Sequence, residues 1–77
     1  MTYTAIYEIY GDGNFLRECE DVFQADDDDE AARLATESED DQTEDAKSYY
    51  EDDEHPFEDV HAKLTTLYDE DGKDVEF

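Results

Sequence analysis

Two stretches of the chain, 3–10 and 60–68, carry apolar side chains at every second position, which is the period of a β-strand with one buried face. The first stretch is rich in β-branched and aromatic residues, and one of its faces holds Tyr3, Ala5, Tyr7 and Ile9. In the second stretch, one face holds Val60, Ala62, Leu64, Thr66 and Tyr68. Both stretches therefore predict strands.

The stretch 15–24 follows a Gly-Asp-Gly-Asn turn, so it predicts the second strand of a β-hairpin with 3–10. Each of its faces mixes apolar and charged side chains: Phe15, Cys19 and Phe23 with Arg17 and Asp21 on one, and Leu16 and Val22 with Glu18 and Glu20 on the other. A β-bulge or a partly exposed strand explains such a pattern. Near the C-terminus, the Asp-Glu-Asp-Gly turn at 69–72 predicts that 73–77 returns as a fourth strand, with Val75 and Phe77 directed inward.

The region between the hairpin and residue 60 has helical spacing. Asp26 is the predicted N-cap, with Asp29 three residues later in the position of a capping box. The apolar stripe of Ala31, Leu34 and Ala35 is resumed in the same phase by Ala46, Tyr49 and Tyr50.

One unbroken helix over 27–53 would be about 40 Å long, which exceeds the length expected of a compact domain of this size. The sequence therefore predicts a break near 40–43, and the region is predicted to end at His55-Pro56. The expected fold is a single α+β domain over 1–77. It has an antiparallel sheet of about four strands in β-β-α-β-β order, covered by one bent helix or two short ones.

The balance of acidic and basic residues excludes some classes of binding partner. Asp and Glu together number 27 against 5 Lys and Arg, giving a formal net charge of -22. Such a chain is repelled by nucleic acid and by anionic membrane surfaces, so a charged partner is expected to be basic. No apolar run reaches the roughly 20 residues of a membrane span, and the N-terminus lacks the features of a signal peptide. We expect a cytoplasmic protein, and a monomer because high like charge opposes pairing.

Known catalytic and metal-binding patterns do not occur. Cys19 is the only cysteine, and the two histidines, His55 and His61, have no metal-ligand spacing. The Asp-rich runs 26–30 and 69–72 do not match a calcium-binding EF-hand loop. Paired carboxylates carry little information in a chain with so many, and so small a chain rarely encloses a substrate. We therefore expect no enzyme activity and no cofactor.

The acidic residues recur along the whole chain, and their density invites comparison with DNA. The size expected of a compact domain is about 30 Å across, and a 30 Å length of duplex carries about 18 negative charges. The Asp/Glu blocks 26–30 and 51–54, together with the interleaved Tyr49 and Tyr50, resemble phage-encoded DNA-mimic inhibitors of the anti-CRISPR and anti-restriction kinds. This resemblance implies an inhibitor that occupies the basic DNA-binding site of a bacterial defence complex. A CRISPR surveillance complex is the first choice, and the protein would act in the cytoplasm of the infected host.

The predicted partner-binding residues lie in the segment 26–54, because it is the longest acidic stretch and a helix would hold its charges in a row. They are Asp26, Asp27, Asp28, Asp29, Glu30, Glu37, Glu39, Asp40, Asp41, Glu44, Asp45, Tyr49, Glu51, Asp52, Asp53 and Glu54. Tyr49, Tyr50 and Phe57 are candidate aromatic anchors for the partner, and the alternative is that they pack in the core.

Two other functions share this composition. One is a small protein of an extreme halophile, which uses excess Asp and Glu to stay soluble in molar salt and needs no partner. The other is an acidic chaperone for a basic protein, for which broad and weak binding is expected. A mimic is expected to select one basic groove.

Overall fold

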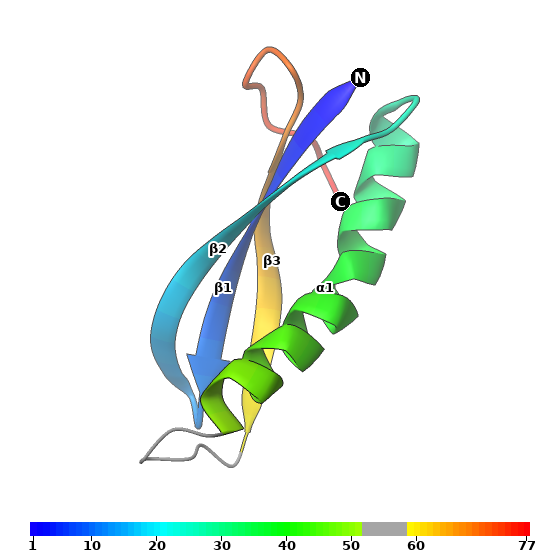
Figure 1. Cartoon of the computed structure of the whole chain (residues 1–77). Helices are drawn as coiled ribbons and strands as arrows, with labels where there is room; N and C mark the ends of the chain where they lie inside the picture. Colours follow the sequence, from blue (N-terminus) through cyan, green and yellow to red (C-terminus); the bar gives the residue numbers. More distant parts are fainter. Residues whose placement is uncertain (52–58) are drawn as a thin grey trace.

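The computed structural model describes residues 1–51 and 59–77, without the side chain of Glu51. These residues form, in chain order, β1 (Thr2–Gly11), β2 (Asn14–Gln24), α1 (Asp28–Glu51) and β3 (Val60–Tyr68). The strands make an antiparallel sheet in the order β2-β1-β3, and α1 crosses one face of it diagonally (Figure 1). The architecture is α+β, as predicted, but the described residues form three strands and one helix, so the predicted four-stranded sheet is wrong.

The core lies between the sheet and α1, and β1 supplies its centre. Tyr3, Ala5, Tyr7 and Ile9 are all at most 1% exposed, which confirms the face predicted from the alternation. Against them pack the small helix residues Ala31, Ala35 and Ala46, all buried, which allow the helix to lie close to the tyrosine rings. β1 is therefore paired on both sides and covered on one face.

Two β-bulges change which side chains point inward. The β1–β2 pairing goes from Ile9 opposite Arg17 to Tyr10 opposite Phe15, so Leu16 is the extra residue. Leu16 packs against the core and Phe15 is left exposed, contrary to the predicted face that grouped Phe15 with Cys19. A bulge was one of the two explanations predicted for this mixed strand.

The second bulge lies in β3, where Tyr7 is opposite Leu64 and Ile6 is opposite Thr66. The extra residue, Thr65, shifts the alternation by one position. Leu67 is therefore fully buried, and the prediction that Thr66 and Tyr68 share a face with Val60, Ala62 and Leu64 is wrong.

The segment 73–77 does not form the predicted fourth strand. It makes one bridge, between Asp74 and Tyr68, and the Val75 N–H donates to the Leu67 carbonyl at 2.7 Å. Val75 is buried as expected, whereas Phe77 is 58% exposed. Further pairing along β3 is blocked because helix side chains already bond to that edge, as described below.

α1 runs without a break through the predicted interruption at 40–43. Its 24 residues span about 36 Å. The prediction of a bent or divided helix assumed a rounded domain about 30 Å across, but the molecule measures 41 × 16 × 15 Å. Strands of 9 to 11 residues give the helix a sheet of matching length to lie on. The predicted end at His55-Pro56 lies outside the described residues.

Candidate partner-binding surface

The N-terminus of α1 uses one of the predicted residues as its cap. The Glu30 N–H donates to Asp27 Oδ1 at 2.8 Å, and the Ala31 N–H donates to the Asp27 carbonyl at 3.0 Å. Asp27 is therefore the N-cap, one residue after the predicted Asp26. Strand pairing explains the offset, because Ala25 still exchanges backbone bonds with Met1 and leaves Asp26 in the connection.

A second predicted residue, Asp28, fastens the start of the helix to β1. The Tyr3 hydroxyl donates to Asp28 Oδ1 at 2.8 Å. Burial of the ring, the bond to Asp28 and the nearby negative charges raise the pKa of Tyr3 to about 12. Two helical turns further along α1, the Tyr7 hydroxyl donates to the Ala35 carbonyl at 2.8 Å. Burial of the ring, together with the charge of Asp21, raises the pKa of Tyr7 to about 12. The two tyrosines thus position α1 on the sheet.

A third predicted residue, Glu39, fastens α1 to the edge of β3. Glu39 Oε2 accepts the Leu64 N–H at 2.8 Å, and one turn later Thr43 Oγ1 accepts the Ala62 N–H at 2.9 Å. With the Val75 bond to Leu67, these contacts occupy the outer edge of β3 along most of its length. Glu39 is half-buried in this role, so it is a structural residue of the helix.

Six further helix carboxylates are exposed to solvent and are called here the acidic helix face: Asp29, Glu37, Asp40, Asp41, Glu44 and Asp45. Among the residues that the structure describes, they take part in one ion pair, between Glu37 and Arg33 at 3.2 Å, and both side chains are about 60% exposed. Such an exposed pair contributes little to stability. The acidic helix face is therefore a row of charges that the fold itself does not use.

The spacing of this row is close to that of DNA. Between Glu37 and Asp45 the helix axis rises about 12 Å, and this length carries five exposed carboxylates: Glu37, Asp40, Asp41, Glu44 and Asp45. The mean spacing along the axis is therefore about 3 Å per charge, compared with about 3.4 Å for one strand of DNA. The row is therefore at least as dense as a phosphate backbone.

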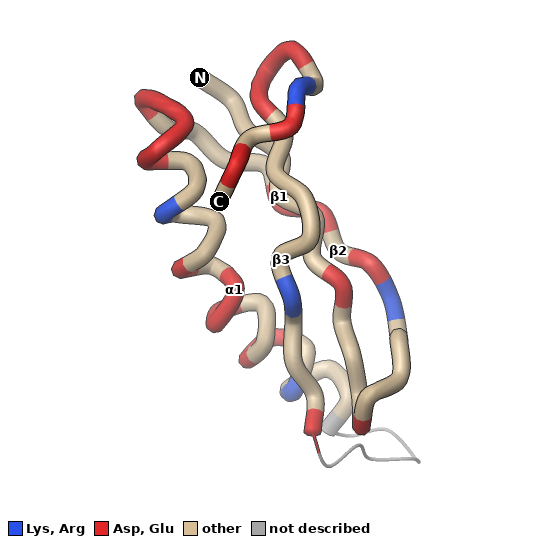
Figure 2. The backbone as a smooth tube through the Cα atoms, turned by 180° about the vertical axis from the view of Figure 1, so that it is seen from behind, with Lys and Arg blue, Asp and Glu red and all other residues tan. Residues whose placement is uncertain are grey.

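The whole molecule has a similar density. Its net charge of -22 spread over its 41 Å length gives one charge per about 1.9 Å, close to the 1.7 Å of duplex DNA. Leaving out the four carboxylates of 52–58 gives -18 and about 2.3 Å. Figure 2 shows acidic positions along α1, β2 and both ends of the sheet, with few basic ones between them. In the part of the chain that the structure describes, no three His, Cys, Asp or Glu residues are grouped closely enough to hold a metal ion.

Tyr49 lies on the sheet side of the C-terminal turn and not within the acidic row. Its ring is 66% exposed, and the Arg17 guanidinium lies over it at 5.0 Å from the centroid. Its edge meets Tyr50, which packs against the core near Ile9. Of the other predicted residues, Asp26 is exposed in the connection before α1 and Glu30 is half-buried. Asp52, Asp53 and Glu54 lie outside the described residues, as does Phe57.

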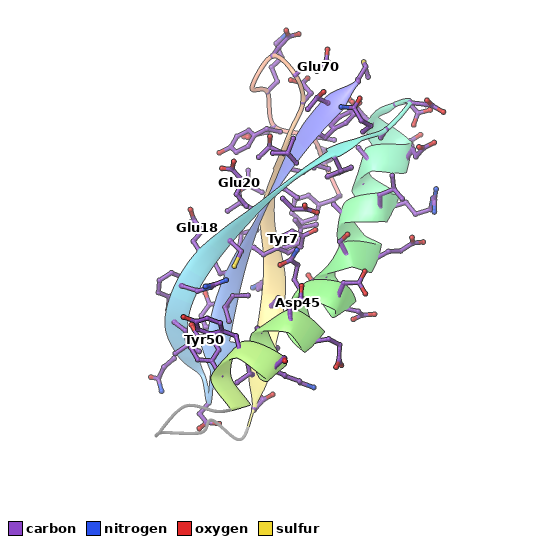
Figure 3. The ribbon with its side chains drawn as sticks, viewed as in Figure 1. Tyr7, Glu18, Glu20, Asp45, Tyr50 and Glu70 are labelled. Atoms are coloured by element: carbon purple, nitrogen blue, oxygen red, sulfur yellow. The ribbon has the colours of Figure 1, made fainter. Side chains whose placement is uncertain are left out.

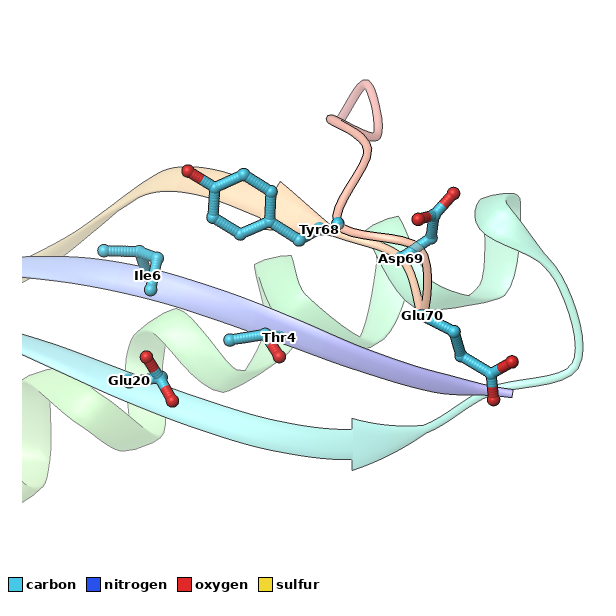
Figure 4. Close-up of a pocket in the computed structure, with 7 residues that line it drawn as sticks. Thr4, Ile6, Glu20, Tyr68, Asp69 and Glu70 are labelled. Atoms are coloured by element: carbon cyan, nitrogen blue, oxygen red, sulfur yellow. The ribbon is translucent and has the colours of Figure 1, made fainter.

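The face of the sheet away from α1 was not among the predicted sites. It carries three acidic residues, Glu8, Glu18 and Glu20, beside the exposed Phe15 and Val22. Near one end, a shallow hollow of about 400 Å³ lies between Glu20, Ile6 and Tyr68 and reaches the 69–72 turn (Figure 4). The alternation of residues in 15–24 predicts that Glu18, Glu20 and Val22 share one face of the strand. That alternation is the sequence feature from which this surface could have been predicted.

Two carboxylates beside the hollow hold the turn together. Asp69 Oδ1 accepts the N–H groups of Asp71 and Lys73 at 2.9 Å, and Glu70 Oε1 accepts the Thr2 N–H at 2.8 Å. One oxygen of each carboxylate is therefore already engaged, and the hollow is too open to enclose a substrate.

Comparison with known proteins gives no relative. No model of a protein family, no curated protein and no solved structure matches the chain. Among the described residues, no helix is both long and apolar enough to cross a membrane.

Proposed function

We propose that this protein is a DNA-mimicking inhibitor. It occupies the positively charged DNA-binding site of a bacterial defence complex and blocks binding of the target duplex, and a CRISPR surveillance complex is the first choice of target. The observation that carries the proposal is the acidic helix face, a band of exposed carboxylates along α1 that makes almost no contacts with the other described residues. Its spacing along the helix is comparable to the phosphate spacing of DNA.

The proposed mechanism has two parts. The long-range field of a chain with net charge -22 speeds encounter with a basic groove. Arg and Lys side chains that normally grip phosphates then pair with Asp40, Asp41 and Glu44, and these close contacts set the lifetime of the complex. The proposal requires no catalysis and no cofactor. It also requires a rigid row, which the tyrosine bonds to α1 supply.

The test is competition for a labelled target duplex. Purified CRISPR surveillance complexes and restriction enzymes are each incubated with the duplex, and the protein is titrated while duplex binding is followed by fluorescence anisotropy. We expect stoichiometric displacement from one class of complex, with an affinity that falls steeply as salt rises. No displacement from any DNA-binding defence complex contradicts the proposal.

A pair of matched variants locates the contact. The first carries Asp40→Asn, Asp41→Asn and Glu44→Gln on the acidic helix face. The control carries Asp71→Asn, Asp74→Asn and Glu76→Gln, which removes the same charge from exposed positions that do not belong to the helix. The first is expected to lose about tenfold or more in affinity and the control much less. Equal losses would mean that only net charge matters, which is the behaviour expected of an acidic chaperone.

A further inference from the structure

The two edges of the sheet differ in what satisfies their backbone groups. Along an antiparallel strand, alternate residues point their N–H and C=O toward the neighbour and away from it. On β3, the outward residues Ala62, Leu64 and Leu67 are bonded to Thr43, Glu39 and Val75 respectively. On β2 the only neighbouring strand is β1, so its outer edge has no strand or helix against it in the described part of the chain.

The outward groups of β2 follow from its register. Met1 and Ala25 exchange backbone bonds, so alternation turns the groups of Phe23, Asp21, Cys19 and Arg17 toward β1. The residues whose N–H and C=O point outward are therefore Glu18, Glu20, Val22 and Gln24. The bulge at Leu16 ends this regular run, which leaves eight residues, 17–24, or about 26 Å of open edge.

The side chains along this edge determine what can pair with it. Glu18 and Glu20 project from β2 away from α1 (Figure 3), and Asp21 lies on the opposite face of the same strand. Glu18 also sits directly opposite Glu8 of β1, so the edge has a surplus of negative charge. A second copy pairing here would set these carboxylates beside their own counterparts, and like charges at cross-strand positions are destabilising. Lys or Arg at the same positions is stabilising.

We propose that the open edge of β2 docks an extended, Lys- or Arg-rich segment of a partner protein by strand addition. The partner's backbone pairs with the outward groups of Glu18, Glu20, Val22 and Gln24, and its basic side chains lie opposite the two glutamates. Val22, which is 57% exposed, offers an apolar contact to an alternate side chain. This surface lies apart from the acidic helix face and does not depend on the DNA-mimic proposal.

The probe is a blocked peptide of about eight residues that alternates lysine and valine, matched to the length of the edge. Amide hydrogen exchange is measured by NMR with and without the peptide. The amides of Glu18, Glu20, Val22 and Gln24 are expected to exchange at least about tenfold more slowly when it is bound. Those of Arg17, Cys19, Asp21 and Phe23 already bond to β1 and are expected to change little.

Two controls separate strand addition from simple charge attraction. The same peptide with alternate amides N-methylated keeps its charge but cannot pair as a strand, so it is expected to leave the four amides unprotected. Glu20→Lys is expected to weaken peptide binding about fivefold more than Glu76→Lys, which makes the same charge change elsewhere. Circular dichroism checks that both variants fold.

Three results would overturn the proposal. They are equal protection by the N-methylated peptide, protection confined to α1, and a β2-mediated dimer of the protein in sedimentation velocity. None of them bears on displacement of DNA by the acidic helix face, and failure of that displacement leaves the edge result unchanged.

Discussion

The two sides of α1 carry the same kinds of residue but use them differently. On the side toward the sheet, Asp28 and Glu39 accept hydrogen bonds from Tyr3 and from the edge of β3. On the outer side, Asp40, Asp41 and Glu44 are exposed and bond to no other described residue. A carboxylate in this helix is therefore either a structural acceptor or a free surface charge, and its position around the helix decides which.

The largest expected loss of stability comes from placing a carboxylate on the buried side of α1. Ala35 is fully buried against the Tyr7 ring, so Ala35→Glu both overfills the core and buries a charge. We expect the variant to lose about 4 kcal/mol or more, enough to abolish the cooperative melt. Thr36→Glu, one position away and exposed, is the control and is expected to change stability by less than about 1 kcal/mol. A folded Ala35→Glu protein would show that α1 does not pack as described.

A smaller loss of stability is expected to distinguish Glu39 from its neighbour Asp40. Glu39→Ala leaves the Leu64 N–H without its acceptor and is expected to cost about 1–2 kcal/mol in urea denaturation. Asp40→Ala is expected to change stability by less than about 0.5 kcal/mol. Glu39→Gln keeps an acceptor oxygen and is expected to restore most of the loss. Equal effects of the two alanine substitutions would remove the distinction between the sides of the helix.

Stability at alkaline pH tests the hydrogen bonds that the hydroxyls of Tyr3 and Tyr7 make to the sheet side of α1. The folded pKa values of Tyr3 and Tyr7 are raised to about 12 from the usual 10, so both residues hold their protons more tightly in the folded state. Their contribution to stability is fully present below pH 10 and is lost as the pH rises toward 12. We expect the melting temperature to fall across this window, and Tyr7→Phe to make the fall shallower. A Tyr7→Phe protein with the full wild-type decline would place the cause elsewhere.

The smallest effect concerns the outer side. Glu37 and Asp41, Asp40 and Glu44, and Asp41 and Asp45 are like charges four residues apart, each pair destabilising the helix by a few tenths of a kcal/mol. Neutralising Asp40, Asp41 and Glu44 together is expected to raise the melting temperature slightly at about 0.1 M KCl, and to have no effect at about 3 M, where screening acts within 3 Å.

The same melts of the unmodified protein test the halophile alternative. A cooperative transition at about 0.1 M KCl favours a mimic, because the acidic surface is then tolerated without molar salt. Folding only near 3 M would instead identify a halophilic protein and remove support for the proposed function.

The sequence predicted the buried faces of β1 and of the helix more reliably than the length of the helix and the pairing of distant strands. The alternation in 3–10 identified the buried face of β1, and the in-phase stripes of Ala35 and Ala46 predicted one helix face, because both depend only on local periodicity. The break in α1 was wrong because it was argued from an assumed rounded shape. The fourth strand was wrong because Glu39 and Thr43 occupy the β3 edge, a contact between distant segments that no local pattern contains.

The candidate site was predictable in outline and not in detail. Asp and Glu at four-residue spacing in 37–45 indicate an exposed acidic surface, and those residues are exposed in the structure. The sequence predicted a helix cap within one residue of Asp27, but it could not show that Asp28 and Glu39 have structural roles, since their partners are distant in the chain. Replacing Asp27, Asp28 and Asp29 with Asn therefore tests a cap and a tyrosine bond as well as charge, and the variant at Asp40, Asp41 and Glu44 is the cleaner one.

The central position of β1 has a consequence for how the protein is made. β1 precedes β2, α1 and β3 in the chain, yet its pairing with β3 joins Thr4 to Tyr68, which is far from it in sequence. The hairpin with β2 can form as soon as β2 is synthesised, while the other edge of β1 stays unpaired until β3 has also been synthesised. Contacts so distant in sequence slow folding. The acidic residues of the nascent chain repel other nascent copies during that interval, so the charge that weakens the folded state also protects the chain before it is folded.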